Sequence, residues 1–168
     1  MNGKIVTRLK EFYLLEKFQV AYYQSQLSST ENEYYVKAFE KMVQIEGGHA
    51  DFFAQQLIAY TGEVPRLAGS LFDQAGTILG ESVELTGPFY TTKLGVALES
   101  KAMEAYRHFI TESARENLSL RNKLMEYLLD EEFHALWLRN YANFLEQKKP
   151  KGPPEQRQVT EPPANRTR

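Results

Sequence analysis

The stretch 124-LMEYLLDEEFHALWL-138 decides the fold of this chain. Its apolar residues Leu124, Leu128 and Leu138 recur at the spacing of one face of an α-helix. Within the same stretch Glu131 and His134 stand three residues apart, and residues at that spacing share a helix face. The stretch therefore predicts an amphipathic helix whose middle carries a carboxylate and an imidazole side by side.

The same periodicity continues outward through nearly the whole chain, and no segment alternates between apolar and polar residues as a strand does. A capping box, Thr30-x-x-Glu33, predicts where the second helix begins. Pro88 after Gly87 predicts the first turn of the third helix, since proline suits that position. Helices are predicted over residues 7–28, 30–60, 86–114 and 119–147. We therefore predict an all-α fold.

The connections between these helices predict the topology. Helices one and two, and helices three and four, are joined by short turns, so each pair forms an antiparallel hairpin. The segment 62–87 is much longer and lets helix three run parallel to helix two. Residues 67–79 of this crossover are predicted to form a short helix of their own. The result is a four-helix bundle of two hairpins joined by a long crossover.

Length and composition limit what the protein can be. A chain of 168 residues has room for one domain, which we place at residues 1–147. The tail 148–168 is rich in Pro, Lys, Gln and Arg and is predicted to be disordered. A net charge of -2 offers no basic field for nucleic acid. The absence of cysteine excludes disulfides, thiolate zinc sites and iron–sulfur clusters.

The N-terminus lacks the apolar core of a signal peptide, and no stretch reaches the length of a membrane span. We therefore expect a cytoplasmic protein.

Two of the three histidines close the same motif, Glu-x-x-His. Glu46 and His49 form it in the second helix, and Glu131 and His134 form it in the fourth. The first and third helices carry one carboxylate each among apolar neighbours, at Glu16 and Glu99. Burying a carboxylate is costly unless it is paired or bound to a metal ion. These six residues are our candidate metal ligands.

The two halves of the chain also repeat. Tyr23 follows Glu16 by seven residues, and Tyr106 follows Glu99 by seven. Glu16 precedes Glu46 by 30 residues, and Glu99 precedes Glu131 by 32. This is a pseudo-twofold pattern. Each tyrosine is open to two interpretations, as part of the packed core or as a participant in the chemistry of the site.

Other features allow two interpretations each. A Glu-x-x-His pair also occurs on ordinary solvated helix faces. Gly47 and Gly48 predict a close backbone approach, a bulge or room for a substrate, or else a break in the second helix. Asp130 is either a partner that orients a ligand histidine or a solvated acid. His108 has no carboxylate three residues before it and is expected at the surface.

The set of four glutamates and two histidines resembles the ligand set of the ferritin-like di-iron and di-manganese proteins. This resemblance implies a centre of two iron or manganese ions, which accept mixed oxygen and nitrogen ligands. Glu16 and His49 are assigned to one metal, and Glu99 and His134 to the other. Glu46 and Glu131 are assigned as bridges between them. Four carboxylates neutralise the charge of two divalent ions.

Within that group the chain most resembles the demethoxyubiquinone hydroxylase family, which shares the ligand order Glu, Glu-x-x-His, Glu, Glu-x-x-His. Gln26 after Tyr23, and the crossover stretches 75–80 (AGTILG) and 85–87 (LTG), are similar to that family too. The resemblance implies an O2-activating monooxygenase with an external electron donor and a small apolar, quinone-type substrate. The crossover acids Asp73, Glu81 and Glu84 argue against contact with a membrane.

The chain is also similar, at the level of the ligands, to rubrerythrin-like proteins. That likeness implies a peroxidase or ferroxidase, and a non-catalytic iron-binding or storage protein is a third alternative. A homodimer is expected, because bundles of this kind often bury a stripe between two copies.

Overall fold

The computed structural model describes residues 3–64, 69–113 and 117–148, and it gives the backbone alone for 69–86. Over these ranges the chain is helical, without a strand, as predicted. The helices are α1 (Gly3–Gln26), α2 (Glu33–Thr61), α3 (Gly69–Ser113) and α4 (Leu118–Gln147), and the short 3-10 helix η1 (Leu27–Ser29) follows α1. The predicted disordered tail lies, apart from Lys148, outside the described residues.

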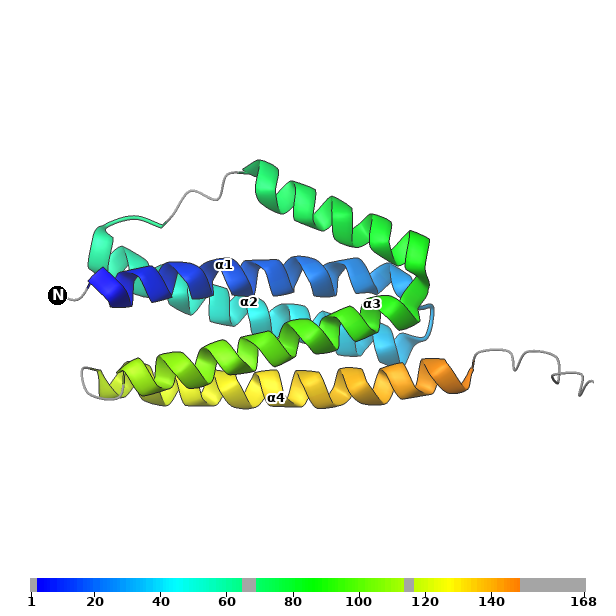
Figure 1. Cartoon of the computed structure of the whole chain (residues 1–168). Coiled ribbons are helices and arrows are strands. Elements are labelled where there is room, and N and C mark those ends of the chain that lie inside the picture. Colours follow the sequence, from blue (N-terminus) through cyan, green and yellow to red (C-terminus); the bar gives the residue numbers. More distant parts are fainter. Residues whose placement is uncertain (1–2, 65–68, 114–116, 149–168) are drawn as a thin grey trace, which may run out of the picture.

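The helices form a four-helix bundle (Figure 1). α1 packs against α2, α3 packs against α4, and α1 also contacts α3. In Figure 1, α1 and α4 run in one direction, and α2 and the second part of α3 run in the other. The described segments therefore have the predicted order of two hairpins and a crossover. Among the described helices none is both long enough and apolar enough to cross a membrane.

α3 consists of two helical segments separated by a kink at Gly87. Gly87 has φ 76° and ψ 168°, a conformation that side chains with a Cβ rarely adopt. Pro88 follows in the first turn of the second segment, where its missing N–H is not needed. The start predicted for the third helix is thus confirmed. The crossover helix is longer than the predicted 67–79, because its helical backbone continues up to the kink.

The predicted capping box of α2 is wrong. Asn32 is the N-cap, and its side chain accepts a hydrogen bond from the backbone N–H of Tyr34 at 3.0 Å. Thr30 is extended, and its hydroxyl accepts from the backbone N–H of Asn32 instead. The helix starts later because Asn32, and not Thr30, caps a free N–H group of the first turn. At the other end, Gly62 caps α2 in the left-handed conformation that glycine favours.

The core contains two aromatic clusters that lie on either side of a polar layer. The first cluster includes Phe12 and Tyr106, and the second includes Tyr23 and Phe39. Between them on α1 lie Glu16 and other buried polar side chains of the bundle: Gln19, Glu46, His49, Glu99, Glu131 and His134. Close-packed aromatic rings flank the layer on both sides.

Two kinds of glycine occur inside the helices. α2 runs without a break through Gly47 and Gly48, and a Cβ added to either would meet nothing within 4 Å. Neither a broken helix nor a close backbone approach therefore explains this pair. Gly95 differs, because a Cβ there would lie 2.1 Å from the hydroxyl oxygen of Tyr22, which donates to the carbonyl of Thr91.

These two environments predict opposite effects of the same substitution. Gly48→Ala is expected to raise the free energy of unfolding by about 1 kcal/mol, because alanine is the better helix former. Gly95→Ala is expected to lower it by about 1–3 kcal/mol, because the Tyr22 ring has to move. Urea unfolding of metal-free protein measures both. A Gly95→Ala variant as stable as the parent would show that Tyr22 does not pack against Gly95.

Candidate metal centre

All six predicted ligands lie in the polar layer, and all are buried. The four glutamates have no exposed surface, and the histidines expose 2% (His49) and 4% (His134). They come from all four helices: Glu16 from α1, Glu46 and His49 from α2, Glu99 from α3, Glu131 and His134 from α4. The Glu-x-x-His spacing aims both side chains of a pair at the bundle axis, because each pair occupies one helix face.

The six residues form two groups whose ligand atoms lie within 4.8 Å of one another. In the first group, Nδ1 of His49 is 3.4 Å from Glu16, 3.1 Å from Glu46 and 3.5 Å from Glu131. We call this the Glu16 group; it consists of Glu16, Glu46, His49 and Glu131.

The second group, here the Glu99 group, consists of Glu46, Glu99, Glu131 and His134. Its histidine places Nδ1 2.8 Å from Oε1 of Glu46. Glu46 and Glu131 therefore belong to both groups, and Glu46 points one oxygen at the histidine of each group. Oε2 of Glu46 and Oε1 of Glu131 face His49, whereas Oε1 of Glu46 faces His134. This is the arrangement that a carboxylate bridging two cations requires.

The ligand atoms of the Glu16 group have no hydrogen-bond partner among the described residues. The unpaired buried atoms there are Oε2 of Glu16, Oε2 of Glu46, Nδ1 of His49 and Oε1 of Glu131. Leaving buried polar atoms unpaired costs about 1–3 kcal/mol each, and more when they are charged. Four converging oxygen and nitrogen atoms without a hydrogen-bond partner fit a metal cation. Both ring nitrogens of His134 are also unpaired.

The layer contains four carboxyl groups and two imidazoles, so full ionisation of the carboxyl groups would leave an excess of buried negative charge. Burial raises the pKa of Glu16 to about 8 and that of Glu131 to about 7. Burial also raises the pKa of Glu99 well above its usual range, with a further increase from neighbouring Glu131. Burial alone would lower the pKa of His49, but the carboxylates of Glu131, Glu16 and Glu46 raise it overall. The layer thus holds protons where cations would otherwise compensate the carboxylates.

Asp130 orients one of the histidines. Nε2 of His49 lies 3.1 Å from Oδ2 of Asp130, whose side chain is 40% exposed. This contact fixes the imidazole ring so that Nδ1 faces the cluster. Both earlier interpretations of Asp130 therefore hold, since it is solvated and contacts a candidate ligand. His108 lies at the surface, as expected, with 63% of its side chain exposed.

The two tyrosines contact the cluster across the bundle. The hydroxyl of Tyr23 on α1 donates to Glu99 on α3, and the hydroxyl of Tyr106 on α3 donates to Glu16 on α1. Both rings are fully buried. Burial, strengthened by the carboxylate each one faces, raises the pKa of both phenols well above 10. They are therefore permanent proton donors that hold Glu16 and Glu99 in place.

Sequence reasoning missed Gln19 as a member of this layer. It is fully buried, and its amide nitrogen lies 2.8 Å from Glu131 Oε2, 3.5 Å from Glu46 Oε1, and 3.1 and 3.2 Å from the two oxygens of Glu99. A signal was present, because Gln19 follows Glu16 by three residues, the spacing at which histidine follows glutamate in the two motifs.

In comparisons with protein-family models, with curated proteins and with solved structures, no match to this chain is found. The interpretation of the buried layer therefore rests on its geometry and its chemistry. Within the described residues the chain is a helical bundle with a buried cluster of glutamates and histidines that is able to hold metal.

Proposed function

We propose that this chain is a ferritin-like, carboxylate-bridged di-iron oxidoreductase that activates O2 or peroxide. Glu16 and His49 would hold one iron and Glu99 and His134 the other, and Glu46 and Glu131 would be shared between the two. One observation carries the proposal: the two groups share Glu46 and Glu131, and Glu46 points one oxygen at the histidine of each group.

The choice of metal follows from the donor set. Carboxylate oxygen with imidazole nitrogen suits iron or manganese, and the chain has no cysteine to select a softer ion. Two divalent ions carry four positive charges, which four carboxylates balance. Iron, when bound, supplies the electrons that reduce O2 or peroxide, and an external donor has to restore them.

The protein residues supply the surroundings of this chemistry. Asp130 orients His49, and Tyr23 and Tyr106 hold the terminal carboxylates Glu99 and Glu16. The aromatic clusters at both ends of the layer keep bulk water away from the reacting atoms.

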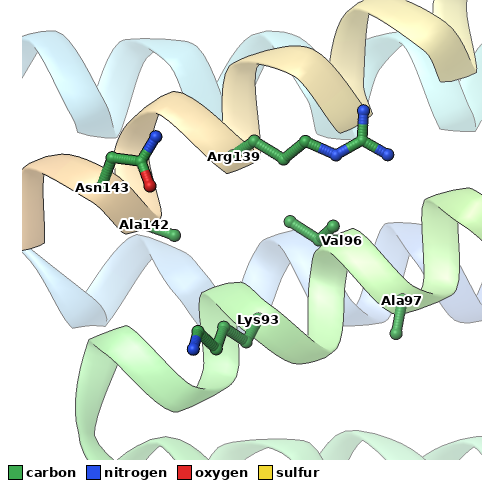
Figure 2. A pocket seen from close by; sticks show the side chains of 6 residues that line it. All are labelled: Lys93, Val96, Ala97, Arg139, Ala142 and Asn143. Carbon is green, nitrogen blue, oxygen red and sulfur yellow. The ribbon is translucent and has the colours of Figure 1, made fainter. Parts of the chain in front are cut away.

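A pocket of about 320 Å³ supports a small-molecule substrate. It lies between α3 and α4, and not beside Gly47 and Gly48 (Figure 2). Its apolar floor includes Val96, one turn before Glu99 on α3, and Lys93 and Arg139 stand at its margin. This hollow is open to solvent and mostly apolar, and it would offer a small apolar substrate a binding surface one turn from Glu99.

The experiment that tests the function is metal analysis of protein grown with iron and purified without oxygen. We expect two irons per chain and, on exposure to O2, a new band in the near-ultraviolet or visible spectrum. Hydroxylation of added quinols would then support the monooxygenase, rapid peroxide consumption the peroxidase, and uptake of many irons per chain the storage protein. No bound metal, and a melting temperature unchanged by ferrous or manganous ions, would refute the centre.

We also propose that a second copy of this chain is a partner. Large apolar side chains line the outer face of α4 at helical spacing, with exposed fractions of 44–66%: Leu118, Met125, Leu129, Phe133 and Leu136. Light scattering that finds only a 19.4 kDa species would contradict the dimer.

A further inference from the structure

We propose that Gln19 makes the two metal positions unequal: its amide occupies the position of the Glu99 group, so the first metal ion binds in the Glu16 group. The second ion enters only when that amide has turned away. This inference rests on the proposed di-iron centre and adds an order of loading to it.

The amide of Gln19 already satisfies the oxygens that a cation in the Glu99 group would bind. Its nitrogen lies 2.8 Å from Oε2 of Glu131, 3.1 and 3.2 Å from the two oxygens of Glu99, and 3.5 Å from Oε1 of Glu46. All three carboxylates of that group therefore surround one nitrogen with two N–H donors. A positively polarised N–H2 stands where the metal is expected.

The Glu16 group has no such substitute. Its four ligand atoms are buried and unpaired, including Oε2 of Glu16 and Nδ1 of His49. A cation that binds there takes the place of the contacts of 3.1–3.5 Å between Nδ1 of His49 and three carboxylates, none of which has hydrogen-bond geometry. A cation in the Glu99 group has to displace two N–H donors from carboxylates. At roughly tenfold or more for each such bond, the second site is weaker by a factor on the order of 100.

The asymmetry belongs to this sequence and not to the bundle. Glu16 and Glu99 are matched by the pseudo-twofold pattern, and each is followed by a tyrosine seven residues later. Three residues after Glu16 stands Gln19, but three residues after Glu99 stands Ala102, which is equally buried. A methyl group donates no hydrogen bond. Only one half of the bundle therefore places an amide among the ligands.

The amide also has a way to admit the second ion. Oε1 of Gln19 is buried and has no hydrogen-bond partner among the described residues. A half-turn about the last side-chain bond exchanges the nitrogen for this oxygen, an acceptor and a hard ligand for divalent iron or manganese. The side chain does not need to leave the layer.

The order of loading is tested by anaerobic titration of the metal-free, full-length protein with Mn²⁺. Calorimetry and electron paramagnetic resonance monitor the titration. The parent is expected to bind one ion first, with the spectrum of an isolated Mn²⁺, and a second ion on the order of 100-fold more weakly. His49→Ala is expected to abolish the first step, whereas His134→Ala leaves it in place.

Gln19→Ala places at position 19 the residue that stands at the matching position, Ala102. This variant is expected to bind the first and second Mn²⁺ ions with affinities within about tenfold of each other. Spin-coupled pairs of ions are then expected from the first additions. Gln19→Met, which keeps most of the volume without an N–H, is expected to do the same if the alanine variant folds poorly. Gln26→Ala is the matched control. Gln26 lies on the same helix, is 1% exposed, and donates to Ser25 rather than to the cluster.

The outcomes separate this inference from the proposed centre. A parent protein that binds two ions with equal affinity would overturn the role of Gln19 and leave the centre intact. Two unequal steps that persist in both Gln19→Ala and Gln19→Met would overturn it as well. A parent that binds no Mn²⁺ and no Fe²⁺ refutes the centre itself, and the inference with it.

Discussion

A chain in which Glu131 is replaced by alanine is expected to bind no metal. Glu131 belongs to both groups, so its removal takes one ligand from each ion. It also removes one of the negative charges that offset the repulsion between the two cations. Loss of a terminal ligand is milder, and His49→Ala or His134→Ala is expected to retain one ion per chain or less. Metal content after anaerobic purification with iron measures all three.

Glu132→Ala is the matched control for this series. Glu132 is the next residue on α4, but its side chain is 44% exposed and pairs with Arg107 at 2.7 Å on the surface. Its loss is expected to leave two metal ions bound. Glu46→Ala is expected to behave like Glu131→Ala. If the variants at 46 and 131 both keep two ions per chain, neither residue is a bridge and the assignment of the centre is wrong.

The metal-free protein is expected to become less stable as the pH rises from 5.5 to 8. Burial raises the pKa of Glu16 from 4.5 to about 8 and that of Glu131 to about 7, so the folded chain keeps protons that the unfolded chain has released. Because the native state binds more protons, the free energy of unfolding falls with pH over this window. The raised pKa of His49 acts in the same direction.

The effect is large. Glu16 alone is expected to contribute a loss on the order of 3 kcal/mol between pH 5.5 and 8, from the shift of its pKa. Metal reverses the trend, because binding requires deprotonated carboxylates and is favoured as the pH rises. Urea unfolding at several pH values, with and without Mn²⁺, measures both slopes.

Glu16→Gln serves as the control for the pH effect, since it keeps the shape of the side chain and removes the titrating group. Its metal-free form is expected to show a shallower fall in stability than the parent. A metal-free parent whose stability rises steadily from pH 5.5 to 8 would show that the carboxylates are ionised and compensated in the folded chain, contrary to the burial described here.

The sequence by itself determined the all-helical class, the approximate positions of the four helices and the start of a helix at Gly87 and Pro88. These features are local: apolar spacing within one helix, and the backbone demands of Gly87 and Pro88, do not depend on distant residues. The six candidate ligands were also readable, because Glu-x-x-His spacing and buried carboxylates such as Glu16 leave a pattern along the chain.

Only the tertiary structure decided how those residues meet. Which oxygen of Glu46 faces which histidine depends on the way four helices pack, and so does the crossing of Tyr23 and Tyr106 to the opposite hairpin. Gln19 shows the limit most clearly, because a glutamine on an apolar stripe is ordinary until three carboxylates from three other helices surround its amide. Helical periodicity is encoded over a few neighbouring residues, whereas the partners of a buried polar group are set by side chains that lie 27 to 112 positions away.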